Sequence, residues 1–141
     1  RRDYVVSYGY QATLPGGGGQ TTYQVAVPKQ NYDTVSVDVL VHNPAQTTLS
    51  LALDVGANGS NEWTFTGNVA STGGRVTATG LASAINSYLA GQSGTEVAVP
   101  MRLTGNTQGT YFLTNLRGIS STNYDLSIAG GNFDKPAPQG W

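Results

Sequence analysis

The sequence predicts an all-β chain: an antiparallel β-sandwich of the jelly-roll or Ig-like kind, with one short helix. Three observations lead to this expectation. Apolar and polar residues alternate in many short segments, which is the period of a half-buried strand. Pairs of Gly, Asn and Pro separate these segments at short intervals, as turns do in antiparallel sandwiches. One segment alone has the spacing of an amphipathic helix.

The composition suits one domain and excludes several kinds of function. The chain has 141 residues, 19 glycines, no cysteine and 11% charged residues. Without cysteine it has no disulfide framework, zinc finger or thiol nucleophile. A net charge of -1 gives no basic surface for nucleic acid. The apolar segments are short and interrupted, so we expect no membrane insertion.

The strands are expected where the alternation is cleanest, at residues 23–27, 35–41, 49–55, 63–65, 97–103, 111–116 and 124–128. They would form a sandwich domain over residues 21–130. Residues 131–141 contain two prolines and lack strand periodicity, which predicts an extended C-terminal tail.

The one helix is expected from Thr79 to Ala90, where apolar residues recur every three or four positions. Thr79 can cap its start and Gly91 its end. We expect about three turns that close one end of the sandwich.

The N-terminal residues 1–14 form the longest one-faced segment. Its even positions are all apolar or aromatic: Tyr4, Val6, Tyr8, Tyr10, Ala12 and Leu14. A linker of residues 15–20 follows, and its four consecutive glycines predict a flexible joint: Gly16, Gly17, Gly18 and Gly19. A strand on such a joint can be given to another copy, and head-to-tail donation builds an open filament. The alternatives are that the segment is the first strand of its own domain, or that it is disordered.

A polar loop between residues 54 and 63 is the second candidate site. Pairing Val55 with Trp63 keeps one apolar face and needs an odd loop around Gly59. Oxygen-bearing side chains then gather there, and they could hold a hard cation such as Ca²⁺: Asp54, Asn58, Ser60 and Glu62. The alternative is a solvated polar hairpin loop. Asn58 also begins an Asn-Gly-Ser glycosylation sequon.

The motif Asp-Val-Gly-x-Asn-Gly-Ser-x-Glu-Trp at residues 54–63 resembles one in adhesin-like β-sandwich domains on the surfaces of archaea and bacteria. A helix like residues 81–89 follows it in those domains, then strands like 96–103 and 109–116. The resemblance implies an extracellular, non-catalytic module. A single domain with its own tethered strand also resembles pilin-like subunits of donor-strand-exchange filaments.

No catalytic residues are predicted. The single histidine, His42, precedes a turn without the partners of a catalytic triad. The chain starts at Arg1 and its one methionine is Met101, so we expect a processed product or a fragment of a longer chain. Removal of a secretory signal is the simplest explanation, and it predicts an extracellular location. The predicted function is a structural subunit of an extracellular filament or pilus, whose partners are copies of itself. The alternative is a carbohydrate-binding or adhesin module that uses its aromatic residues on glycans.

Overall fold

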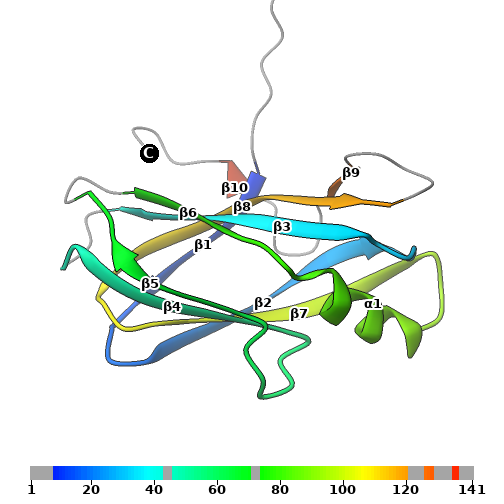
Figure 1. Cartoon of the computed structure of the whole chain (residues 1–141), viewed down its shortest axis with the longest axis horizontal. Helices are drawn as coiled ribbons and strands as arrows, with labels where there is room; N and C mark the ends of the chain where they lie inside the picture. Colours follow the sequence, from blue (N-terminus) through cyan, green and yellow to red (C-terminus); the bar gives the residue numbers. More distant parts are fainter. Residues whose placement is uncertain (1–7, 43–45, 71–73, 121–125, 129–134, 137–141) are drawn as a thin grey trace, which may run out of the picture.

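The computed structural model describes residues 8–42, 46–70, 74–120, 126–128 and 135–136. It confirms the all-β prediction, because two antiparallel sheets face one another and one short helix lies at an end of the sandwich (Figure 1).

One sheet has six strands, in the order β10-β1-β8-β3-β6, and β9 also pairs with β8. Its strands are β1 (Tyr8–Leu14), β3 (Thr34–His42), β6 (Gly74–Ala78), β8 (Gly109–Ile119), β9 (Leu126–Ile128) and β10 (Lys135–Pro136). The other sheet has four strands, in the order β2-β7-β4-β5. They are β2 (Gly19–Pro28), β4 (Thr48–Val55), β5 (Trp63–Asn68) and β7 (Glu96–Gly105).

The pairing of the first eight strands follows a simple rule. β4 pairs with β5, β3 with β6, β2 with β7, and β1 with β8. The eight strands form one long hairpin that is rolled up, so that successive strand pairs lie in alternate sheets. This is the topology of a jelly roll. β1 is therefore one of the eight strands of the jelly roll, and it pairs with the last of them, β8.

The core lies between the sheets and is built by the expected alternation. The valines of β3 at positions 35, 37, 39 and 41 are at most 3% exposed, and the leucines of β4 at positions 49, 51 and 53 are at most 2% exposed. Because successive strand residues point to opposite faces, one side of each strand meets the other sheet.

The helix α1 (Ala82–Ala90) starts later than predicted. Its N-cap is Leu81, and the predicted cap Thr79 lies outside it. Leu81 is fully buried and its N–H donates to the Val35 oxygen at 3.4 Å, so the core fixes where the helix begins. Ile85 and Leu89 follow on the same buried face. In the part of the chain that the structure describes, no helix is long and apolar enough to cross a bilayer.

Other strands also differ from the prediction. β6 was not expected, because its five residues are too short for a clear alternation and only Ala78 is buried. β2 begins at Gly19, so the last two residues of the expected linker belong to a strand. Within the expected C-terminal tail, Lys135–Pro136 pairs with β1 as β10.

Candidate functional site

The first candidate site is β1 together with the slot that holds it, which is the position beside residues 109–114 of β8. In this single chain, β1 pairs antiparallel with β8 of its own sheet, from Gly9 opposite Thr114 to Leu14 opposite Gly109. On its other side only Tyr8 and Gly9 pair, with β10. Over residues 10–14, β1 therefore has a ladder on one side alone within the described residues, as an edge strand does.

The side chains of Tyr10 and Leu14 in β1 face the core, as the sequence pattern predicts. Leu14 is 1% exposed, and the ring of Tyr10 stacks on Tyr23 of the opposite sheet with centroids 4.9 Å apart. The Tyr10 hydroxyl lies 2.8 Å from the Thr21 hydroxyl oxygen. Burial, and secondarily the neighbouring Tyr10, raises the pKa of Tyr23 far above its ordinary value. β1 thus joins the two sheets.

The remaining donor-strand residues are only partly described. Ala12 is half-buried in β1. The structure describes the backbone of Tyr8, whereas Tyr4 and Val6 lie outside the described residues. Gly9 approaches β8 so closely that an added Cβ would stand 2.0 Å from the Leu113 oxygen. Only glycine fits there, so this position fixes the register of β1 against β8.

The glycine linker forms one defined turn that carries the chain from one sheet to the other. Gly16, Gly17 and Gly18 have φ values of +86°, +61° and +86°. The Gly17 N–H donates to the Asn106 oxygen at 3.0 Å, and the Gly18 N–H donates to the Gly105 oxygen at 3.1 Å. Positive φ disfavours residues with a Cβ, so this closed turn requires glycine. Whether the joint also opens stays a prediction.

The second candidate site is the loop between β4 and β5, and its predicted register was wrong. Trp63 lies opposite Leu53, and Phe65 lies opposite Leu51, two residues earlier than expected. A shift of two keeps every side chain on the same face, so the apolar face survives. The longer loop that results has room to fold back over the outer face of the sheet.

Asp54 is the anchor of this loop. Its carboxylate is fully buried and accepts hydrogen bonds from the N–H groups of Asn58, at 3.1 Å, and Gly59, at 2.8 Å. Arg102 lies directly opposite on β7, and its guanidinium donates to Asp54 Oδ2 at 2.6 Å. Both carboxylate oxygens therefore have partners, and this part of the loop is not the solvated hairpin considered above.

The other expected cation ligands have different partners. Glu62 Oε1 accepts the N–H of Val55 at 2.6 Å, and Asn58 Oδ1 accepts the N–H of Ser60 at 3.0 Å. Among the described residues, no three His, Cys, Asp or Glu side chains gather as a metal site would need. A cation at Asp54 would compete with the Arg102 guanidinium, so calcium binding stays a prediction. Asn58 is exposed, and its glycosylation also stays a prediction.

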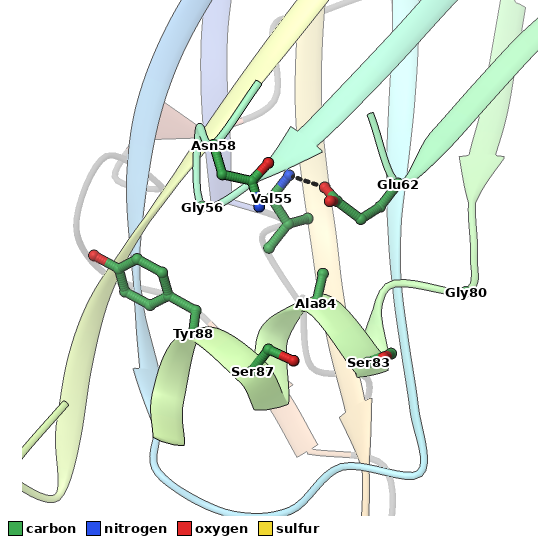
Figure 2. Close-up of a pocket in the computed structure, with 9 residues that line it drawn as sticks. All are labelled: Val55, Gly56, Asn58, Glu62, Gly80, Ser83, Ala84, Ser87 and Tyr88. Carbon is green, nitrogen blue, oxygen red and sulfur yellow. Dashed lines mark hydrogen bonds between the residues drawn. The ribbon is translucent and has the colours of Figure 1, made fainter. Parts of the chain in front are cut away.

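The loop and α1 enclose a cleft of about 530 Å³ (Figure 2). Val55 from β4 and Ala84 from α1 point toward each other across it. Glu62 and Asn58 border it from the loop side, and the side chains at positions 83, 87 and 88 border it from α1. Ser83, Ser87 and Tyr88 were not expected to join this loop, because sequence spacing alone shows no contact between a helix and a distant hairpin.

Comparison of the chain with protein-family models, curated proteins and solved structures found no match. The strand order therefore defines the class, a jelly-roll β-sandwich. The resemblance to adhesin-like domains and pilin-like subunits stays a prediction.

Proposed function

We propose that this chain is a non-enzymatic, structural subunit of an extracellular filament, in which each copy gives its N-terminal strand to the next copy. The observation that carries the proposal is the combination found in β1. It supplies core-facing side chains to the sandwich, yet it lies at the side of the sheet and leads into a glycine joint.

A strand in the slot beside β8 stabilises the sandwich, whichever copy supplies it. An absent β1 would leave one side of β8 unpaired over residues 109–114, while β3 stays on the other side, and would expose the ring of Tyr23. A strand from a second copy can make the same hydrogen bonds and bury the same side chains. Exchange of identical strands between copies therefore loses few contacts. An exchange that does not close into a ring continues from copy to copy and builds a fibre.

Release of β1 breaks its ladder with β8 and the contacts of Tyr10 and Leu14, which an incoming strand can restore, and few interactions besides. The linker is held by the backbone hydrogen bonds from Gly17 and Gly18, and β10 pairs with only two residues of β1. Glycine can adopt the positive φ of the closed turn as well as the extended backbone of an open joint. The balance between closed and exchanged forms then depends on the strain of the turn and on protein concentration.

Removal of residues 1–14 tests the proposal. The full chain should form filaments visible by negative-stain electron microscopy, and the truncated chain should form none. Adding a synthetic peptide of residues 1–14 should occupy the vacant slot and raise the melting temperature of the truncated chain. Filaments of unchanged form from the truncated chain would refute strand donation.

A further inference from the structure

We propose that the cleft between the β4–β5 loop and α1 binds a neutral sugar, as a single residue or the end of a neutral glycan. This inference concerns a different end of the molecule from strand donation. α1 and the β1–β2 turn lie at opposite ends of the long axis of the sandwich (Figure 1). Binding at the cleft can therefore be measured independently of filament assembly.

The cleft has the dimensions and the mixed character of a small-molecule site. Its volume of about 530 Å³ falls within the range usual for ligand pockets. Val55 is 1% exposed and Ala84 is half-buried, and together they give the cleft an apolar base. Around that base stand a carboxylate, an amide and three hydroxyl groups. A pyranose matches this arrangement, because it has apolar C–H faces and a hydroxyl-bearing edge.

Two side chains at the border of the cleft are held in place. Glu62 is fixed by the hydrogen bond from the Val55 N–H to its Oε1, shown as a dashed line in Figure 2. The ring of Tyr88 lies against the loop backbone, since an added Cβ on Gly56 would stand 3.3 Å from Tyr88 Cδ1. Fixed groups lose little entropy when a ligand binds. Tyr88 and Glu62 border the cleft from opposite sides (Figure 2). An aromatic ring on one side can stack on a sugar while a carboxylate on the other side accepts hydrogen bonds from its hydroxyl groups.

Four polar groups of the cleft are available to a ligand. Within the described part of the chain, the hydroxyls of Ser83, Ser87 and Tyr88 have no hydrogen-bond partner, and neither does Glu62 Oε2. Among the described residues that line the cleft, Glu62 supplies the one ionised group, and none is a cation. A negative ligand would be repelled there, whereas a neutral polyol would find donors and acceptors.

Saturation-transfer difference NMR tests the proposal on the full chain, because the method observes the ligand and works with monomers and filaments alike. The probes are the methyl glycosides of glucose, galactose, mannose and N-acetylglucosamine. The protein is made in a host that does not glycosylate Asn58. We expect a saturable signal from at least one probe.

The variant Glu62→Gln isolates the role of the carboxylate. The amide side chain keeps an oxygen for the Val55 N–H but replaces the charged acceptor, so the Kd should rise about tenfold. Tyr88→Phe retains the ring and should have a smaller effect. Glu96→Gln, at an exposed carboxylate on β7 outside the cleft, is the matched control and should leave the Kd unchanged. The proposal is overturned if no probe gives a saturable signal, or if the two glutamine variants bind alike.

Discussion

At the scale of single residues, Asp54 organises the loop that forms one wall of the cleft. Its carboxylate holds two backbone N–H groups and the Arg102 guanidinium while fully buried. A buried charge is tolerated only where such partners replace water. The Asp54 side chain therefore stabilises the loop conformation that places Asn58 and Glu62 at the cleft, together with the hydrogen bond from the Val55 N–H to Glu62.

Asp54→Ala should lower the free energy of unfolding by about 1–3 kcal/mol, because two N–H groups and a partly buried guanidinium lose their acceptor. Urea titration measures the loss. Asp33→Ala, at an exposed aspartate, is the matched control and should have little effect. Equal losses in the two variants would contradict the anchoring role.

The same variant decides between the anchoring role and calcium. If Asp54 serves the loop alone, EDTA leaves the melting temperature of the unaltered chain unchanged. A fall with EDTA that Asp54→Ala abolishes would establish the calcium site instead.

Two buried tyrosines predict alkaline unfolding. Burial raises the pKa of Tyr111 to about 12, and its hydroxyl donates to the Thr107 oxygen at 2.9 Å. Above about pH 10 the tyrosines of the unfolded chain ionise while Tyr111 stays neutral in the folded chain. The free energy of unfolding therefore decreases. Stability should be intact below about pH 10 and fall between about pH 10 and 12. Burial also raises the pKa of Tyr23, which adds to the fall.

Urea midpoints measured at several pH values from about 9 to 11 follow this loss of stability. Tyr111→Phe removes one titrating group, so its stability should fall less steeply over the same range. If the urea midpoint falls as steeply with pH in that variant, a group other than Tyr111 causes the loss of stability at alkaline pH.

Sequence reasoning placed the core-facing residues better than the polar contacts. Alternation predicts burial of Leu14 and Tyr10 because side-chain direction has a fixed period along a strand. Nothing local predicts that Arg102 meets Asp54, since 48 residues separate them and the register of β4 on β7 brings them together. Helical spacing likewise does not predict that the Asn86 amide makes two hydrogen bonds with the Tyr32 backbone, 54 residues away.

At the scale of elements, the turn between β1 and β2 controls whether the first strand remains in its own sheet. Its glycines have positive φ in the closed form. Extended backbone in an open joint has negative φ, which residues with a Cβ adopt without strain. Substitution in the turn therefore biases the two forms differently.

Changing both Gly17 and Gly18 to Ala should strain the closed turn by roughly 1 kcal/mol per residue and raise the filament fraction. An added Cβ meets nothing within 4 Å at either position, so strain is the only effect expected in the closed form. Sedimentation of filaments at fixed concentration measures the fraction. Gly59→Ala is the matched control, because Gly59 has φ +92° and equally open surroundings outside the linker. A double variant that loses stability as the control does, with no more filament, would argue against an opening joint.

Elements with strong periodicity were predicted, and elements set by tertiary contact were not. β3, β4 and β7 are long enough to show their alternation in full. The start of α1 was misplaced because burial of Leu81 outweighed the capping preference of Thr79. The hairpin register was misplaced because Asp54 holds the loop back over the outer face of the sheet, a contact that turn preferences do not include.

At the scale of the whole molecule, the jelly roll explains why one strand can serve either copy. β1 and β8 are the first and the last of the eight strands of the rolled hairpin, and they pair with each other. Replacing it changes neither the order nor the register of the inner pairs. The interior pairs β3–β6 and β4–β5 would remain within one chain in a filament.

Disulfide trapping measures most directly which copy supplies β1. Thr13 of β1 and Thr110 of β8 are register partners on the outer face, with hydroxyl oxygens 3.2 Å apart, and the natural chain contains no cysteine. A chain with both Thr13→Cys and Thr110→Cys can therefore form one disulfide between these strands. It is oxidised under filament-forming conditions and separated on a denaturing, non-reducing gel, with each single-cysteine chain as a control. Strand donation predicts a ladder of covalent oligomers that collapses to monomer on reduction. Disulfide-bonded monomer alone, from filaments or from solution, would contradict it.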